Sequence, residues 1–175
     1  MPCALTANYS QKDCIEGIGG MPEAYIIESG NAEFEETAGV ITAITNAPTK
    51  KWYHYTFARE VCNAKSTLTT NVQNGTQFHA HEIAIVLNKM KSATRNELKL
   101  LSKNNVYIIV KDGNGTWWLF GRQNGLDATG GGSDTGTAAG DRNGYTRTFT
   151  SNEPEMEIEV DADLIAALET AGVTP

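Results

Sequence analysis

The stretch that decides the fold begins with Leu68-Thr-Thr-Asn-Val-Gln73, turns through Asn74-Gly75 and continues as Thr76-Gln-Phe-His-Ala-His81. Asn-Gly is the dipeptide that best supplies the two positive φ angles of a type I′ turn, so a β-hairpin is predicted in which Gln73 pairs with Thr76. This register divides the ribbon into two faces, one with Val72, Gln77, Thr70, His79, Leu68 and His81, the other with Asn71, Phe78, Thr69 and Ala80. Neither face is apolar enough for a core, and so polar a ribbon is only marginally stable alone in water. We therefore expect neighbouring copies of the chain to pair with it.

The second strand of this hairpin does not stay polar. It continues as Glu82-Ile-Ala-Ile-Val-Leu87, an apolar run with the length of a buried strand and far short of a membrane span. Residues 68–81 are therefore expected to project from a base that is rooted in the core. After Asn88 the period becomes helical, with Met90, Thr94, Leu98 and Leu101 on one face and a capping box at Thr94-x-x-Glu97.

The opposite face of this predicted helix is basic, with Lys91, Arg95, Lys99 and Lys103 each four residues apart. A solvated face explains such a row, and docking onto an acidic surface is the alternative. Near the C-terminus Glu155, Glu157 and Glu159 share one face of a predicted strand, an arrangement that costs stability unless water or a basic partner meets it. The candidate electrostatic docking residues are Arg95, Lys99, Lys103, Glu155, Glu157 and Glu159.

A second hairpin is strongly apolar. Val106-Tyr-Ile-Ile-Val110 and Thr116-Trp-Trp-Leu-Phe120 flank the turn Lys111-Asp-Gly-Asn-Gly115, and both strands are expected to be largely buried. Trp117 and Trp118 are neighbours in a strand and therefore point to opposite faces. At least one of them must pack outside the main core.

The remaining segments complete one domain over residues 1–175. Strands are predicted at 24–28, 40–45, 50–59, 145–150 and 155–160, followed by a short helix that is capped by Asp161 or Asp163 and turns Leu164, Ile165 and Leu168 inward. Residues 1–22 are interpreted as an N-terminal arm, 31–39 as an acidic connector and 121–144 as a Gly-rich loop with a flexible tip at Gly130, Gly131, Gly132, Ser133 and Asp134. There is no repeat and no second core. The predicted fold class is mainly β (α+β): an antiparallel β-sandwich or partial barrel with one packed α-helix, a long projecting β-hairpin and a short C-terminal helix.

Composition narrows the possible partners. A chain of 175 residues with 40% hydrophobic residues and a mean hydropathy of −0.34 is expected to form one soluble domain, with no membrane span or signal peptide. The net charge of −7 argues against a protein that binds nucleic acid tightly. It is compatible with the lining of a channel through which DNA passes without binding. Cys3, Cys14 and Cys62 follow no CxxC pattern and are expected to be reduced thiols in a cytoplasm.

Sequence patterns for chemistry are weak. There is no G-x-S-x-G elbow, and His54, His79 and His81 lack a paired acid at a recognisable spacing, so no catalytic residues are assigned and a non-enzyme is predicted. His79 and His81 share a strand face and could bind a metal with Cys62 or His54, but they fit surface or interface positions better. The segments that start at Asp112 and Asp141 resemble calcium loops but lack the twelfth-position glutamate, so both are interpreted as turns. No cofactor and no metal are predicted.

The C-terminal half resembles tail tube-like structural proteins of bacteriophages, especially those of Bacteroidetes hosts. The residues that carry the resemblance are the helix from Met90, Val106-Tyr-Ile-Ile-Val110, Gly121, Asn124-Gly-Leu126, the Gly-rich loop, Asp141-Arg-Asn-Gly-Tyr145 and Glu153. The resemblance implies a homo-oligomeric ring, commonly hexameric and stacked, whose inner strands join around a DNA channel. It also implies contact with tape-measure and terminator proteins, assembly in the host cytoplasm and a final place in the virion tail. Carried onto this chain, Met1 to Pro22 and Asp127 to Gly140 would bridge rings, and the luminal or subunit-contact residues would be Thr70, Asn71, Val72, Gln73, Asn74, Gly75, Thr76, Gln77, Phe78 and His79.

Two other functions remain open at this point. One keeps the protein in the virion as a head decoration or head-to-tail connector protein, which would bind capsid or portal without stacking on itself. The other is a stand-alone carbohydrate- or metal-binding β module that uses Trp52, Tyr53, Tyr55 and the histidines. The assembly state of the purified protein separates these functions from the tail tube.

Overall fold

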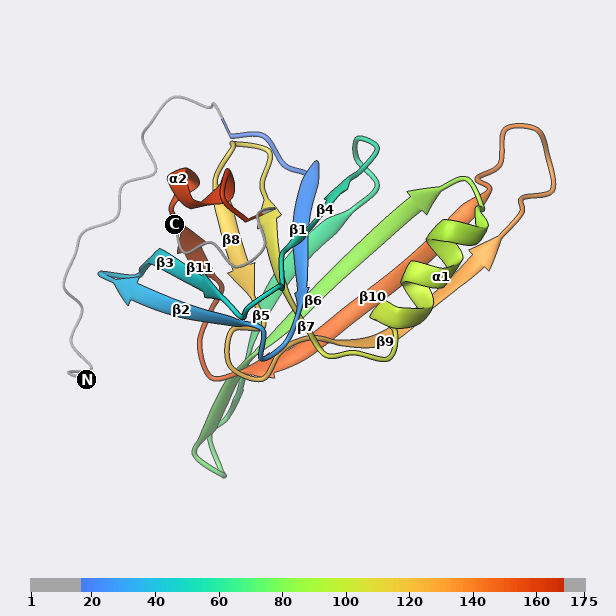
Figure 1. The fold of residues 1–175 in the computed structure, drawn as a ribbon. Coiled ribbons are helices and arrows are strands. Elements are labelled where there is room, and N and C mark those ends of the chain that lie inside the picture. The colour runs from blue at the N-terminus through green and yellow to red at the C-terminus, as the bar shows by residue number, and fades with distance from the viewer. Residues whose placement is uncertain (1–16, 169–175) are drawn as a thin grey trace.

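The computed structural model describes residues 17–168 and has the predicted mainly β fold, with two sheets, one helix of 10 residues and a short C-terminal helix (Figure 1). Sheet A has seven strands in the order β2-β3-β11-β8-β7-β1-β4, and sheet B has four in the order β5-β6-β10-β9. Sheet A contains β1 (Glu23–Glu28), β2 (Ala32–Thr37), β3 (Val40–Asn46), β4 (Tyr53–Thr56), β7 (Val106–Lys111), β8 (Trp117–Phe120) and β11 (Ile158–Val160). Sheet B contains β5 (Asn63–Asn71), β6 (Thr76–Asn88), β9 (Asp127–Asp134) and β10 (Gly144–Glu153). The helices are α1 (Ser92–Leu101) and α2 (Ala162–Ile165).

Sheet A is buried on both faces, so its central strands are apolar throughout. Along β7, Ile108 packs into an inner core between the two sheets, whereas Ile109 packs into an outer core on the other face of sheet A. The outer core is closed by Leu164, Ile165 and Leu168 from the C-terminal segment. The single core expected from the sequence is therefore two clusters that share one sheet, because both faces of β7 and β1 are covered.

The apolar hairpin was predicted correctly. β7 and β8 are antiparallel neighbours, and Trp117 packs into the outer core while Trp118 packs against the inner core. Each tryptophan thus serves a different cluster, as strand alternation requires.

The polar hairpin of β5 and β6 forms as predicted, but its register is different. Asn71 pairs with Thr76, so residues 72–75 form a four-residue loop rather than a two-residue turn. The Asn71 side chain explains the difference, because its Oδ1 accepts a hydrogen bond from Asn74 N at 3.1 Å and closes the longer loop. The shift amounts to two residues, so the side chains that remain in the ladder keep their predicted faces, whereas Val72 lies in the loop.

Helix α1 begins two residues before the predicted capping box. Its N-cap is Lys91, without a side-chain capping bond, so the box at Thr94 is not used. A distant residue determines the start instead, since Asn143 accepts hydrogen bonds from Lys89 N at 2.6 Å and Met90 N at 2.9 Å. Leu98 is buried and Leu101 packs against the inner core, whereas Met90 is exposed before the helix begins.

Three other segments differ from the predictions. The acidic connector is largely strand β2, and the Gly-rich loop contains strand β9, paired along β10. The last strand is shorter than predicted: β11 starts at Ile158, pairs in parallel with β3, and leaves Met156 exposed rather than in the core. Local composition concealed β2 and β9, because edge strands tolerate the polar and glycine residues that normally indicate loops. β11 lies inside sheet A, between β3 and β8, and only its short length departs from the prediction.

The two ends of the chain have different outcomes. Asp161 caps α2 as predicted, with its side chain accepting from Asp163 N. The predicted arm falls largely on residues 1–16, which lie outside the described residues. Within residues 17–168 no helix is long and apolar enough to cross a membrane.

Candidate functional site

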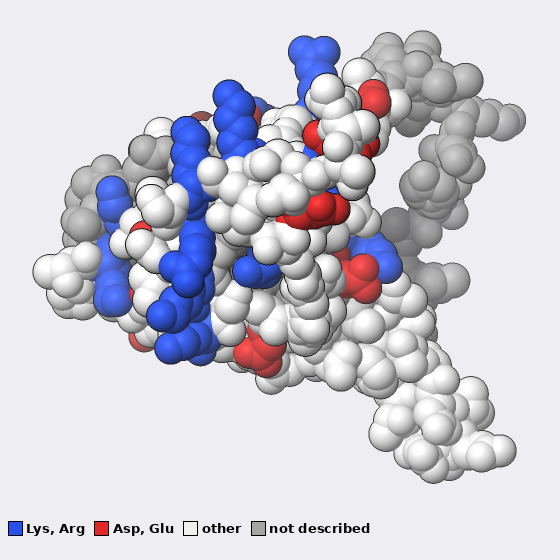
Figure 2. Space-filling model, turned by 90° about the vertical axis from the view of Figure 1, so that its right-hand side faces the viewer, with Lys and Arg blue, Asp and Glu red and all other residues white. Residues whose placement is uncertain are grey.

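The β5–β6 hairpin extends past both cores and projects from the body of the protein (Figure 1). From Thr67 to Ala80 it contains no Asp, Glu, Lys or Arg, although charged residues make up 20% of the sequence. Figure 2 shows this projection as a white lobe without charged side chains. Along it Leu68 is 53% exposed, and in the loop at its tip Val72 is 88% exposed. An uncharged projection with exposed apolar side chains is typical of a contact surface.

The predicted contact residues from Thr70 to His79 all lie on this projection. Those from Thr70 to Gln77 are exposed, and Phe78 and His79 are half-buried where the ribbon approaches the body. Pairing of Leu68 with His79 and of Ser66 with His81 places both histidines on one face, as predicted.

Both outer strands of sheet B have an open edge. Within residues 17–168, β5 pairs only with β6, and β9 pairs only with β10. The residues predicted as a loop tip, from Gly130 to Asp134, therefore form the exposed margin of a sheet. An exposed edge of this length is a template for another strand, and natural proteins rarely leave one uncovered.

The face of sheet B that points away from the inner core is polar and weakly acidic, because the pairing of Asp134 with Gly144 and of Asp127 with Thr150 places two exposed carboxylates on it. Thr146, Thr148 and Thr150 alternate along β10 with the buried Phe149 and the half-buried Arg147. On the neighbouring strands Lys65 and Glu82 pair across the sheet at 3.0 Å. Such a face has no cluster of basic side chains with which to hold phosphate groups.

A buried polar cluster lies at the root of the hairpin. His81 is 2% exposed, its Nδ1 accepts from Gly121 N at 3.3 Å, and its ring packs edge-on against Phe120. Three buried atoms here have no hydrogen-bond partner among the residues that the structure describes: Ser66 Oγ, His81 Nε2 and Glu157 Oε2. Burial lowers the pKa of His81, and the nearby carboxylates of Glu153 and Glu157 oppose this effect.

Glu153 connects the base of the β5–β6 hairpin to the loop after β8 through hydrogen bonds. It is 2% exposed and accepts hydrogen bonds from Gln123 N, Asn124 N and Ser151 Oγ. A buried carboxylate is tolerated only with such partners. The sequence resemblance included Glu153 and Asn124, and the structure shows that they are in contact.

The predicted docking residues are not brought together within one chain. Arg95, Lys99 and Lys103 are exposed on α1, and Figure 2 shows a band of basic side chains on this flank. The three glutamates do not form one solvated face, because Glu157 is half-buried and Glu155 lies 3.9 Å from Arg122, which also pairs with Glu36. Glu159 alone of the three is exposed and has no ion pair in the described part of the chain.

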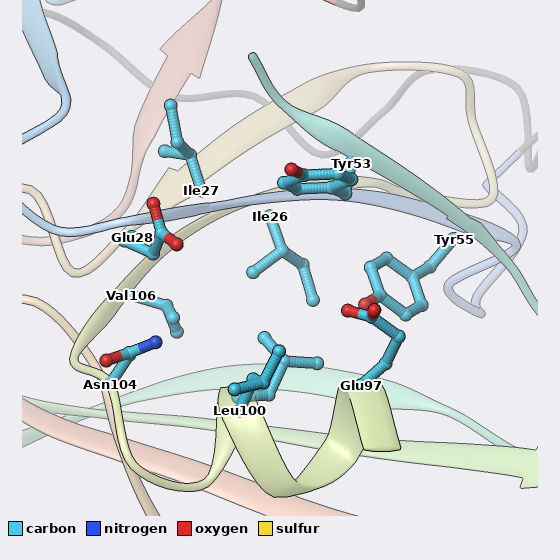
Figure 3. A pocket seen from close by; sticks show the side chains of 10 residues that line it. Ile26, Ile27, Glu28, Tyr53, Tyr55, Glu97, Leu100, Asn104 and Val106 are labelled. Atoms are coloured by element: carbon cyan, nitrogen blue, oxygen red, sulfur yellow. The ribbon is translucent and has the colours of Figure 1, made fainter. Parts of the chain in front are cut away.

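The aromatic segment before β5 does not form a binding face. Trp52 is 1% exposed and donates to Asn46 Oδ1 at 2.9 Å, so its indole belongs to the outer core. Tyr53 and Tyr55 line a hollow of about 150 Å³ between β4 and α1 (Figure 3). That volume is below the range of about 300–1,000 Å³ that is usual for ligand pockets. Burial beside Glu97 raises the pKa of Tyr55 to about 12.

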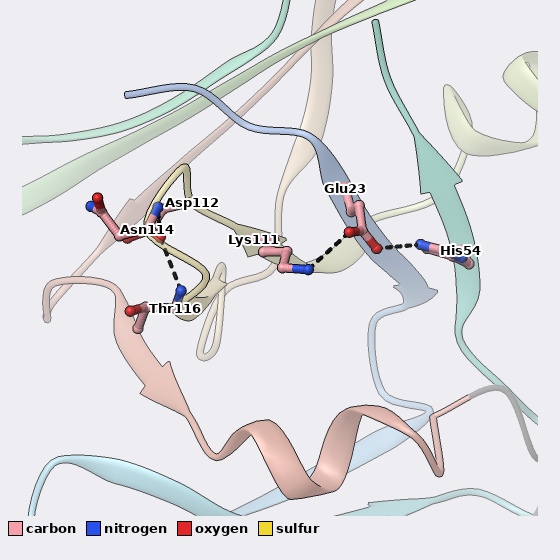
Figure 4. A network of polar contacts seen from close by, with 6 residues as sticks. All are labelled: Glu23, His54, Lys111, Asp112, Asn114 and Thr116. Carbon is pink, nitrogen blue, oxygen red and sulfur yellow. Dashed lines mark hydrogen bonds and ion pairs between the residues drawn. The ribbon is translucent and has the colours of Figure 1, made fainter. Parts of the chain in front are cut away.

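A polar network joins three adjacent strands of sheet A. Glu23 of β1 binds Lys111 of β7 and His54 of β4, each at 3.0 Å (Figure 4). The hydrogen bond from Lys111 is the main reason that the pKa of Glu23 is lowered, with His54 adding to the effect. His54 therefore helps to hold the edge strand β4 against β1 in sheet A.

The calcium-like segment at Asp112 is a turn, as predicted, whereas at Asp141 the turn comes before the segment and ends at Asp141, whose N donates to Ala138 O. Asp112 Oδ1 accepts from Asn114 N and Thr116 N, and Asp141 Oδ2 accepts from Thr137 N and Ala138 N. The backbone bonds lower the pKa of Asp141. Among residues 17–168 no group of three His, Cys, Asp or Glu side chains could hold a metal ion. Cys62 is a buried free thiol whose pKa is raised by burial.

Comparison with known proteins adds no relative. A scan against known protein families, a search of curated proteins and a search of solved structures each found no match. The candidate site therefore rests on the geometry of the hairpin and the sheet edges.

Sequence reasoning missed two elements of this surface, the β9 edge and the acidic strand β2. A weak signal was present in each, since Ala32-Glu-Phe-Glu alternates apolar with acidic residues, and Ala128 is an isolated apolar residue before the glycines. Ala32 is indeed buried and Ala128 packs against the inner core.

Proposed function

We propose that this chain is a structural subunit of a bacteriophage tail tube. Copies associate side by side through sheet B into a ring, and rings stack to enclose a channel that passes DNA. The observation that carries the proposal is a four-stranded sheet with two open edges, from which an uncharged hairpin projects.

The open edges support a repeating contact. If β5 of one copy pairs with β9 of the next, the same contact recurs at every subunit, and an association of this head-to-tail kind closes into a ring when its rotation closes. A hexamer, as the sequence resemblance implies, would join 24 strands, six times the four strands of sheet B. Barrels of about 16–18 strands already leave an aqueous channel.

The polar face of sheet B supports the conduit role. In such a ring it would point either to the lumen or outward, and the cores already cover its other face. A weakly acidic surface that is rich in threonine neither attracts nor retains a polyanion.

Negative-stain electron microscopy and sedimentation velocity of the purified chain test the proposal. We expect rings or tubes for the wild type and monomers for Val72→Glu, because a charge on the uncharged hairpin opposes burial in a contact. Val72 is 88% exposed, so this substitution leaves the monomer folded. Met156→Glu is the matched control, since Met156 is 58% exposed but lies off the hairpin and off sheet B. A wild type that remains monomeric at high concentration contradicts the proposal.

A further inference from the structure

We propose that the basic face of α1 in one copy docks onto an acidic patch at the β2 end of sheet A in the next copy of the same ring. This inference rests on the proposed function and names the lateral contact between subunits. It replaces the pairing with Glu155 and Glu157 expected from the sequence, because Glu155 lies close to Arg122 and Glu157 is half-buried.

The basic face is unpartnered in the described part of the chain. Lys91, Arg95, Lys99 and Lys103 are all exposed, and among residues 17–168 none of the four forms an ion pair. Four like charges in one row repel one another, so the row is destabilising by itself. An opposing acidic surface removes that repulsion.

The acidic patch consists of Glu33, Glu35 and Glu159. Glu33 and Glu35 alternate along β2 with Phe34, which packs on the outer core, and Glu159 lies between Ile158 and Val160, which also pack there. All three glutamates therefore point to the opposite face of sheet A, and all three are exposed. Glu159 pairs with Val40 of β3, the strand next to β2, so the three glutamates lie on one face within three neighbouring strands.

The two surfaces lie on opposite flanks of the molecule (Figure 1). Residues of α1 and β4 line one hollow, and β4 and β2 are the two ends of the seven-stranded sheet. Six interstrand spacings separate them, roughly 29 Å. Because the Debye length at physiological salt is about 8 Å, the two surfaces do not neutralise each other within one chain. Their complementarity becomes effective only between copies.

The open edges of sheet B fall on the same two flanks. Arg147 of β10 contacts Ser102 at the end of α1 and Gly132 of β9, so the β9 edge accompanies the basic face. Ala64 of β5 lines a hollow with Trp118 and Glu157, next to β11, so the β5 edge accompanies the acidic patch. One head-to-tail step therefore brings strand edge to strand edge and basic face to acidic patch together. In a two-fold symmetric dimer a basic face would meet a basic face, or an acidic patch an acidic patch, and the repulsion between like charges disfavours such a dimer.

Charge reversal with mutual rescue tests this inference. Arg95→Glu/Lys99→Glu and Glu33→Lys/Glu35→Lys are made separately, and association is measured by sedimentation velocity at about 50 mM and about 500 mM salt. Each variant alone should associate at least about tenfold more weakly than the wild type at low salt. An equimolar mixture should recover association, because each reversed surface then meets its opposite in the other variant.

The matched control is Lys51→Glu/Arg59→Glu, which changes the net charge as much as the reversal on α1 does. Both residues are exposed, and neither is on α1 or β2. The inference is overturned if the reversed variants associate like the wild type, if the control weakens association equally, or if the mixture fails to recover. It is also overturned if the wild type stays monomeric at low salt.

Failure of the inference and failure of the proposed function are distinguishable by imaging. Rings in both the wild type and the reversed variants would retain the tail tube proposal and remove this contact. Salt-sensitive association that is rescued by mixing, but without rings or tubes, would retain the contact and remove the tail tube.

Discussion

Replacing Gly131 by alanine should either strain the backbone of β9 or detach β9 from β10. The same change at Gly132 should not lower stability. Gly131 has φ +136, which side-chain-bearing residues rarely adopt, and a Cβ there would lie 2.2 Å from Thr146 O. Gly132 has no atom within 4 Å of an added Cβ and no positive φ. The two neighbours therefore form a matched pair within one strand.

The cost at Gly131 follows from two effects. Backbone strain contributes about 1–3 kcal/mol, and overpacking against the β10 backbone contributes about 1–3 kcal/mol more. The total has a ceiling, because the chain escapes the clash if β9 leaves β10. Alanine at Gly132 should change stability by no more than about 1 kcal/mol, in the stabilising direction, since it restricts the unfolded chain.

Urea unfolding followed by tryptophan fluorescence measures the global free energy, and amide exchange of residues 127–134 reports on β9 itself. We expect Gly131→Ala either to lose about 2–4 kcal/mol or to unfold β9 locally, with rapid exchange in that segment. Equal stability and equal exchange for the two variants would refute the reasoning and restore a flexible loop. A ring that uses the β9 edge should also fail to assemble in Gly131→Ala.

Three other outcomes follow from the structure. Burial lowers the pKa of His81 below its usual 6.5, so the unfolded chain binds the proton more readily than the folded chain does. The free energy of unfolding should therefore be greatest above pH 6.5 and should fall as the pH decreases toward the lowered folded pKa. In urea titrations His81→Gln should flatten this pH dependence, and His79→Gln should retain it. Leu98→Ala should cost about 2–5 kcal/mol in thermal or urea unfolding, because Leu98 is 1% exposed, whereas Leu100→Ala, at a side chain that is 55% exposed, should change stability by less than about 0.5 kcal/mol. Glu153→Gln should cost about 1–3 kcal/mol, because the amide offers one acceptor oxygen to donors that now share two, and an unchanged unfolding midpoint would contradict this role.

The candidate site was predictable where local sequence dominates. Asn74-Gly75 and the polar strands beside it identified the hairpin, and their scarcity of apolar side chains led to the prediction, still untested, that it is a contact surface. The basic row on α1 was equally visible, since helical spacing places its members on one face. The environment of Glu155 was not predictable, because a run of alternating glutamates does not reveal which of them an arginine elsewhere in the chain will approach, here Arg122.

By itself the sequence determined the elements that carry a strong period or turn: the two hairpins, helix α1, the apolar β7 and the inward side chains of α2. Only the tertiary structure decided that residues 127–134 form an edge strand, that the polar hairpin closes two residues earlier, and that basic and acidic surfaces lie on opposite flanks. The physical reason is that period and turn preference arise from neighbouring residues. Edge pairing, loop closure and the placement of charge depend instead on strands distant in the chain, such as β10 beside β9.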